Sequence, residues 1–429
     1  MKHSQNHMLG IRNARVFTPQ GLFSADFIVK EGIISKLNSK LSFPEDCDEI
    51  VDACNAIILP SFVDMHVHLR EPGFSYKETI RTGSLAAAAG GFTTVCSMPN
   101  LNPAADSLTN LSVQLEIIKN DAVMDVIPYA TITQGRKGDK LVDYNQLAPF
   151  VAGFSDDGSG VQSEEVMRRA MKEIAATGKI LAAHCEVESL LEGGYIHKGE
   201  YCASHGHKGI CSESEWKEVE RDIRLAAETG CRLHICHMST KESVDLVRQA
   251  KKDGLPVTCE TGPHYLTFSD KDIREHGRFK MNPPIRSLED RDALRQGVID
   301  GTIDVIATDH APHSIEEKSR GLKGSAMGVV GLETAFSAVY TTMVRSGLMS
   351  LDRLVEVMAA KPREILKLPL LPSLREGAAA NFVVIDPDKS FIVNPEEFKT
   401  LGRSTPYDGE NLYGKILMTC YNGNIIYKA

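Results

Sequence analysis

Residues 64–73 read Asp-Met-His-Val-His-Leu-Arg-Glu-Pro-Gly, and they close a short apolar run that begins at Ile57. Side chains two residues apart on a β-strand point to the same side, so His66 and His68 can bind one ion from one face. Two unrelated polar histidines give the same spacing. The choice between these interpretations depends on what the rest of the chain places beside this segment.

The pattern of an apolar run followed by a helix-like stretch recurs as far as His313 and is typical of βα units. Helical patterns over 79–89, 163–177 and 213–229 end at Gly90-Gly91, Gly178 and Gly230, where a C-cap needs left-handed backbone. Two further helices, 331–345 and 351–366, are expected on the outside. The fold class predicted is α/β, a closed (β/α)8 TIM-like barrel. Its expected strands are 57–66, 92–98, 124–131, 150–155, 180–183, 232–236, 256–259 and 304–308.

The two ends of the chain have a different pattern from the middle. Residues 11–29, 33–51, 380–392 and 414–427 are short, alternating and rich in turn formers, as in strands of a β module. Because one half precedes the barrel and the other follows it, we expect a composite β-sandwich. The predicted domains are 1–58 and 371–429 for the two halves of the sandwich and 59–370 for the catalytic barrel.

Composition restricts the function. The 429 residues are 42% hydrophobic and 24% charged, with a formal net charge of −9 and scattered basic residues, which disfavours nucleic acid as a partner. The ten cysteines include no CxxC pair, which favours reduced thiols and a cytoplasmic location. The polar start and the lack of a long apolar run disfavour a signal peptide and a membrane partner.

Three more candidate ligands stand at the ends of later predicted strands, namely His184, His237 and Asp309. A barrel brings such ends together at one mouth, which favours a metal site over isolated structural residues. Imidazole and carboxylate ligands suit zinc, with manganese or iron as alternatives.

The order of HxH, His, His and Asp along a barrel resembles the amidohydrolase superfamily, and His68-Leu-Arg-Glu-Pro-Gly73 is more narrowly similar to the dihydroorotase family of the bacterial class I type. Five further motifs carry this resemblance, which covers nearly the whole chain: Ser97-Met-Pro-Asn100, Phe154-Ser-Asp-Asp-Gly158, Thr261-Gly-Pro-His-Tyr-Leu266, Lys280-Met-Asn-Pro-Pro284 and Thr308-Asp-His-Ala-Pro-His313.

The resemblance implies a second carboxylate ligand. Many relatives carry a bridging carboxylated lysine after the fourth strand, whereas this chain has two aspartates there. Alignment through the motif gives the role to Asp157, with Asp156 as the alternative. If both only form a polar turn, the site holds one metal instead of two zinc ions. The implied metal ligands are His66, His68, Asp157, His184, His237 and Asp309.

The resemblance also implies the substrate contacts. Arg70, Asn100 and His313 are expected to hold a free carboxylate, which a guanidinium fork and neutral donors suit. Asn282 is expected at a pyrimidine ring, with backbone contacts from Met327 and Gly328, although Met327 replaces a commoner Phe. The substrate-binding residues are therefore His68, Leu69, Arg70, Asn100, Asn282, His313, Met327 and Gly328.

The implied activity is the reversible zinc-dependent opening of the cyclic amide of dihydroorotate to N-carbamoyl-aspartate in pyrimidine biosynthesis. Asp309 would take the proton of the attacking water and deliver it to the ring nitrogen. An allantoinase or hydantoinase is the nearest alternative, and a non-catalytic partner of aspartate transcarbamoylase is a second. A homodimer is usual among relatives, and association with aspartate transcarbamoylase is possible for this kind of chain.

Three features remain without an assigned role. The charged, glycine-rich stretch 314–324 is expected to be a mobile connection at the barrel mouth. His264 is a structural residue or an outer neighbour of the metals. His197, His205 and His207, with Cys202 and Cys211, resemble no common zinc spacing.

Overall fold

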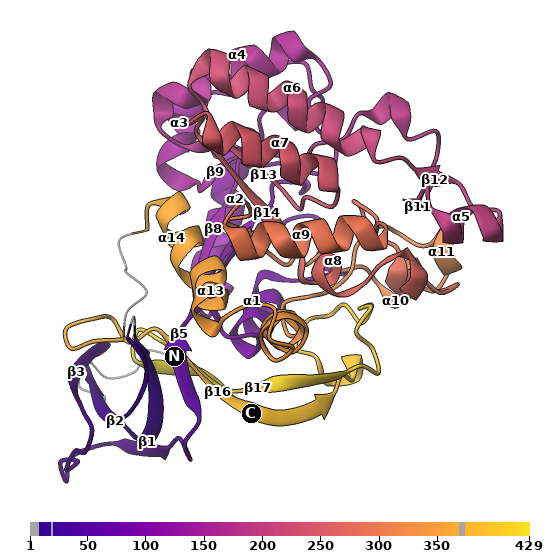
Figure 1. Ribbon diagram of the computed structural model, residues 1–429. Helices are drawn as coiled ribbons and strands as arrows, with labels where there is room; N and C mark the ends of the chain where they lie inside the picture. The colour runs from indigo at the N-terminus through magenta and orange to yellow at the C-terminus, as the bar shows by residue number, and fades with distance from the viewer. Residues whose placement is uncertain (1–7, 19, 369–373) are drawn as a thin grey trace.

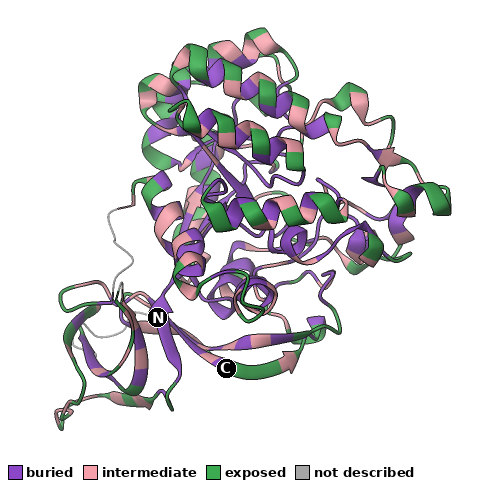
Figure 2. Ribbon diagram, viewed as in Figure 1, coloured by how far each residue is buried: buried purple, intermediate pink, exposed green. Residues whose placement is uncertain are grey.

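The computed structural model describes residues 8–18, 20–368 and 374–429. Its centre is a set of parallel strands with helices outside them (Figure 1). Burial follows this plan, because most residues of the central strands are buried and the helices around them expose their outer faces (Figure 2). No helix in the described ranges is long and apolar enough to cross a membrane.

The central strands form two parallel sheets, β6-β7-β8 and β15-β14-β13-β10-β9. Two isolated parallel bridges connect them: Ala130 pairs with Phe154 beyond β8, and Val67 of β6 pairs with His310 beyond β15. The strands are β6 (Phe62–Val67), β7 (Phe92–Ser97), β8 (Asp125–Pro128), β9 (Gly153–Phe154), β10 (Ile180–Ala183), β13 (Arg232–Ile235), β14 (Val257–Thr261) and β15 (Val305–Ile306).

Helices follow most of these strands and cover the sheets. Helix α4 (Glu164–Thr177) ends at Gly178 (φ 70°), and helix α6 (Glu213–Thr229) ends at Gly230 (φ 69°), as the sequence predicts. In α1 the left-handed residue is Gly91 (φ 89°), because Gly90 is still right-handed. The main helices are α1 (Ile80–Ala89), α2 (Leu108–Asp121), α4 (Glu164–Thr177), α6 (Glu213–Thr229), α7 (Lys241–Lys252), α8 (Pro263–Thr267) and α9 (Leu288–Asp300).

The two predicted outer helices are interrupted. The first is α12 (Ala335–Val339) followed by a π-helical turn, Tyr340–Val344. The second is α13 (Leu351–Val355), a π-helical turn (Glu356–Ala360) and α14 (Lys361–Leu366). Pro362 lacks the backbone N–H that a regular α-helical ladder needs at the start of α14, which accounts for the second interruption.

Both ends of the chain pair into one eight-stranded sheet, with β5 between β1 and β16. The yellow C-terminal strands run beside the indigo N-terminal strands in Figure 1. The sheet contains β1 (Met8–Thr18), β2 (Gly21–Lys30), β3 (Ile33–Asn38), β4 (Glu49–Asp52), β5 (Ile57–Pro60), β16 (Phe382–Ile392), β17 (Asn411–Tyr421) and β18 (Asn424–Lys428).

The predicted strand 57–66 is wrong as a single strand, because it divides into β5 and β6. Ser61 donates its backbone N–H to Asn381 in the terminal part, and the next residue, Phe62, donates to Gly91 in the central part. The chain therefore changes sheets between these two residues, close to the predicted boundary at 58/59. The other predicted boundary, 370/371, lies outside the described residues.

Candidate functional site

The six predicted ligand residues lie together where the central strands end. His66 is in β6 and His68 follows it directly. The other four stand a few residues beyond the carboxyl ends of β9, β10, β13 and β15: Asp157, His184, His237 and Asp309. All six are buried. Parallel strands bring these positions together because their carboxyl ends open on the same edge.

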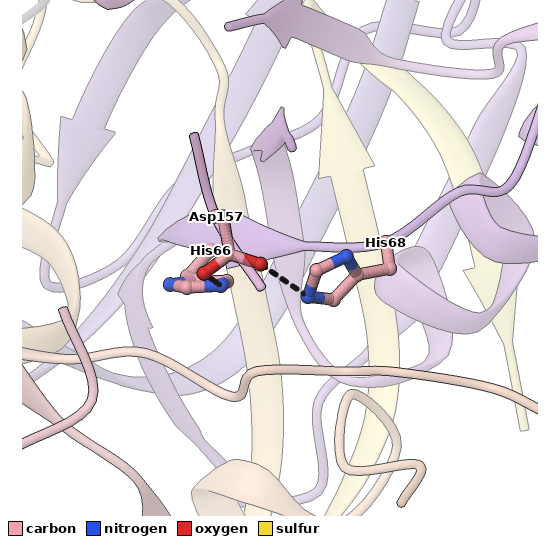
Figure 3. A group of neighbouring side chains, drawn as sticks. All are labelled: His66, His68 and Asp157. Atoms are coloured by element: carbon pink, nitrogen blue, oxygen red, sulfur yellow. Dashed lines mark ion pairs between the residues drawn. The ribbon is translucent and has the colours of Figure 1, made fainter. Parts of the chain in front are cut away.

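Asp157 occupies the middle of this group. Its Oδ1 lies 3.4 Å from Nε2 of His66, 3.4 Å from Nε2 of His237 and 3.5 Å from Nδ1 of His184. Its Oδ2 faces the other way and lies 3.5 Å from Nε2 of His68, as Figure 3 shows for the His66, His68 and Asp157 part of the group. One carboxylate oxygen thus faces three imidazole rings, and the other oxygen faces the fourth ring.

Asp309 completes the side nearest His68. Its Oδ1 lies 3.1 Å from Nε2 of His68 and 3.6 Å from Nε2 of His66. Its backbone has φ 47°, and His237 and Arg70 also have positive φ (32° and 58°). Non-glycine residues rarely adopt this conformation, and it concentrates at functional sites, where the surrounding structure holds it.

The donor set fits divalent metal. Two ligand atoms are buried without a hydrogen-bond partner within the described part of the chain, Nε2 of His66 and Oδ1 of Asp157. Buried polar atoms normally have partners, so adjacent ligand atoms without one fit a bound metal ion. Two groups whose ligand atoms lie within 4.8 Å of one another share Asp157: His66, His68 and Asp157, and Asp157, His184 and His237.

The electrostatics of both aspartates suit coordination. Burial alone would raise the pKa of Asp157, but the neighbouring histidines outweigh it and hold the pKa well below its usual range. The same balance of burial against histidines lowers the pKa of Asp309. Both carboxylates are therefore ionised at neutral pH, which metal binding requires.

Glu260 of β14 supports His66 from behind and was missed by the sequence analysis. Its Oε1 accepts a hydrogen bond from Nδ1 of His66 at 2.7 Å, and its Oε2 lies 3.2 Å from Nε2 of His234. A carboxylate on the second nitrogen fixes the ring orientation and tautomer of a metal-binding histidine. The only available signal was an acidic residue inside an otherwise buried strand.

Asn100 orients His68 in the same way. Its Oδ1 lies 2.8 Å from Nδ1 of His68, which leaves Nε2 of that ring facing Asp157 and Asp309. A second missed residue, Asp64, fixes the strand beneath: its Oδ1 accepts the backbone N–H of His66 at 3.0 Å. The same carboxylate accepts the backbone N–H of Thr308 at 3.2 Å, which ties the first and last central strands together.

Asp156 points away from the histidines. Its Oδ1 accepts the backbone N–H groups of Ile132 (2.8 Å) and Thr133 (3.1 Å), and the Thr133 hydroxyl donates to its Oδ2. Asp156 therefore stabilises the loop after β8, and Asp157 alone of the pair faces the ligand group.

The predicted carboxylate-binding residues flank the ligand group. Arg70 is buried and donates from Nε to the carbonyl of Pro312 at 3.3 Å. Burial lowers the pKa of Arg70 to about 10, so it stays charged at neutral pH. Nε2 of His313 donates to the carbonyl of Met327 at 2.8 Å, and its Nδ1 lies 3.2 Å from Nζ of Lys77. Both nitrogens of His313 are thus engaged.

The remaining predicted substrate contacts differ in what they offer. Nδ2 of Asn282 donates to Glu186 at 2.9 Å, and its Oδ1 is buried without a partner in the described ranges. Gly328 (φ 135°) donates its backbone N–H to Lys280 at 3.1 Å. The Leu69 side chain packs against Gly83, where a Cβ would lie 2.4 Å from its Cδ2. Only the backbone of Leu69 can face the site.

Two further histidine groups are not among the six residues. His264 in α8 is buried, and burial lowers its pKa to about 4. His207 donates to Glu275 (2.7 Å) and contacts the Tyr195 hydroxyl (2.8 Å). No described cluster around His197, His205 or His207 brings three ligand atoms within 4.8 Å.

Comparison with known proteins gives concordant matches. The model of a dihydro-orotase-like family matches residues 55–243. A dihydroorotase from Fusobacterium nucleatum is 46% identical over 418 residues, covering 97% of this chain and 98% of that protein. A dihydroorotase from Enterococcus faecalis is 46% identical over 419 residues, covering 96% and 97%.

Solved structures share the fold. An L-hydantoinase from Arthrobacter aurescens superposes with a TM-score of 0.86 at 27% identity, over 98% of this chain and 96% of that one. A dihydropyrimidinase from Brevibacillus agri gives a TM-score of 0.85 at 20% identity, over 98% and 95%. The second match concerns the fold alone.

Proposed function

Because the chain belongs to the dihydroorotase family, we propose that the six buried residues at its strand ends form the active site for the reaction of that family. The chain is a cyclic amidohydrolase of pyrimidine biosynthesis, and it interconverts dihydroorotate and N-carbamoyl-aspartate. The observation that carries the site assignment is the central position of Asp157, whose Oδ1 faces His66, His184 and His237 and whose Oδ2 faces His68.

The family is metal-dependent, and the donor set suits two zinc ions. His66, His68 and Asp309 would hold one ion, His184 and His237 the other, with Asp157 between them. A metal held by these residues would lower the pKa of a water molecule to near 7 and polarise the amide carbonyl. Nitrogen and carboxylate donors favour zinc over magnesium or calcium.

Asp309 is the proton carrier in this proposal. Ring opening needs a base for the attacking water and an acid for the departing ring nitrogen. Asp309 is ionised, lies beside His68 and is buried, so it can take the first proton and return it to the nitrogen. In the biosynthetic direction the same carboxylate takes the nitrogen proton as the ring closes.

Arg70 recognises the substrate carboxylate. A buried, charged guanidinium close to the site supplies donors in a fork that fits a carboxylate. Arg70→Met should raise KM for dihydroorotate about 10- to 100-fold, because the substrate carboxylate loses one or two hydrogen bonds to a charged group. Metal content should stay unchanged. Steady-state kinetics with elemental analysis checks this, and an unaltered KM would remove Arg70 from substrate binding.

Glu260 supports metal affinity through His66. Glu260→Gln keeps the shape but removes the negative charge that fixes the His66 tautomer, so metal affinity should fall about 10- to 100-fold. Titration with a competing chelator measures this shift. Glu173→Gln, a change on α4 with no contact to the ligand group, is the control. Equal affinities in the two variants would contradict the assignment.

For the central strands around this site, we propose that they close into one barrel. Its support is the pair of bridges, Ala130 to Phe154 and Val67 to His310, which join the edges of the two parallel sheets into a ring. The composite β-sandwich, the domain limits 1–58, 59–370 and 371–429, the homodimer and the cytoplasmic location stay predictions, as does association with aspartate transcarbamoylase.

The proposed function is tested by turnover of dihydroorotate, hydantoin and allantoin side by side, before and after chelation, with metal counted per chain. We expect dihydroorotate to be the preferred substrate and chelation to abolish its turnover. Zinc should restore it. Preference for hydantoin or allantoin would assign the chain to another cyclic amide, and metal-free protein with full activity would overturn the metal assignment.

A further inference from the structure

Lys318 is a buried lysine in the segment that follows His313. It ends the short helix α10 (Ile315–Lys318), its residue is only 4% exposed, and its Nζ donates to the carbonyls of Lys280 (2.9 Å) and Ala326 (2.8 Å). Among the described residues no carboxylate lies within ion-pair distance of it. Burial lowers the pKa of Lys318 to about 7, and burying an amine without an anionic partner is costly, so this position needs a reason beyond packing.

The two carbonyls belong to different walls of the proposed substrate pocket. The carbonyl of Lys280 also accepts the backbone N–H of Gly328 at 3.1 Å, and Lys280 stands two residues before Asn282. Ala326 directly precedes Met327. The amino group of Lys318 thus joins the segment that carries Asn282 to the segment that carries Met327 and Gly328.

Lys318 is itself held firmly in place. The Ser325 hydroxyl donates to its carbonyl at 3.0 Å, and the backbone N–H of Ala326 donates to Glu317 at 2.9 Å. Gly277 packs so closely that a Cβ there would lie 2.2 Å from the Lys318 carbonyl oxygen. The stretch 314–324, which the sequence suggests as a mobile connection, contains α10 and a second short helix, α11 (Gly321–Gly324).

We propose that Lys318 is a positioning residue for the substrate ring: it sets the separation of the two backbone segments that contact the ring. The inference rests on the proposed function, because those segments are substrate contacts only if the chain binds dihydroorotate there. Groups that bind a substrate must be held within a fraction of an ångström, and Lys318 holds both segments through their backbone carbonyls. Its loss should therefore affect substrate binding and leave the proton transfer at Asp309 intact.

The test uses the metal-loaded full chain and the variant Lys318→Met, which keeps the length of the side chain and removes its donors. We expect KM for dihydroorotate to rise about tenfold, with kcat within about threefold and metal content unchanged, since two hydrogen bonds of modest net value are lost. The matched control is Lys323→Met on α11 of the same segment, whose side chain is exposed. This control should keep wild-type kinetics.

The outcomes separate this inference from the function on which it rests. No dihydroorotate turnover by wild-type protein would refute the proposed function. With an active wild type, equal KM values for Lys318→Met and Lys323→Met would overturn the positioning role, as would a fall in kcat that accompanies metal loss. If Lys318→Met does not fold, the variant Lys318→Arg is measured instead, because arginine keeps hydrogen-bond donors but displaces both carbonyls. A raised KM with unchanged kcat in Lys318→Arg supports the positioning role. An unchanged KM overturns it.

Discussion

Asp309→Asn should lower kcat about 10³-fold in both directions, measured on metal-loaded protein, while the chain stays folded. The amide has nearly the shape of the carboxylate but cannot carry the proton between the water and the ring nitrogen. Asparagine also tolerates the positive φ of this position (47°), whereas alanine would add backbone strain. Asp309→Ala should be inactive too, with lower stability.

The measurement is steady-state turnover of dihydroorotate and of N-carbamoyl-aspartate, on protein whose metal content has been determined. Asp304→Asn is a matched control, because Asp304 precedes the same strand but pairs with Lys251 (2.7 Å) and the backbone of Cys259 (3.0 Å), away from the ligand group. Its kcat should be close to that of the wild type. Near-normal turnover by metal-replete Asp309→Asn would exclude Asp309 as the proton carrier.

Asp157→Ala should lose most of its metal and lower turnover by about 10³-fold or more, since the nucleophile at neutral pH depends on the metal. Asp157 contributes an oxygen to each of two groups of ligand atoms, so one substitution weakens both. Four imidazoles and one carboxylate, that of Asp309 beside His68 and His66, remain to offset the charge of the metal. The metal content, measured by elemental analysis, and the turnover rate should fall together.

The neighbouring Asp156→Asn is the control for this result. Asp156 accepts hydrogen bonds from Ile132 and Thr133, and burial raises its pKa to about 6. An amide can keep only part of these bonds, so stability should fall by about 1–3 kcal/mol while metal content stays at the wild-type level. Full metal content in Asp157→Ala, or metal loss confined to Asp156→Asn, would transfer the bridging role to Asp156.

Much of the site follows from local rules. The two-residue repeat of a strand puts His66 and His68 on one face, and the recurrence of apolar runs places His184, His237 and Asp309 at strand ends. Parallel strands joined by helices must open their carboxyl ends on one side, so a correct count of strands brings these residues together. Membership of the dihydroorotase family follows from the motifs around them.

The amino-acid sequence by itself was enough to predict the α/β class, the position of the histidines at strand ends and the family. Tertiary structure alone decided which member of the Asp156-Asp157 pair faces the histidines, that Glu260 supports His66 across 194 residues, and that the run 57–66 divides between two sheets. The physical reason is that periodicity fixes which face a side chain occupies. Its partner depends on which distant segments fold against that face.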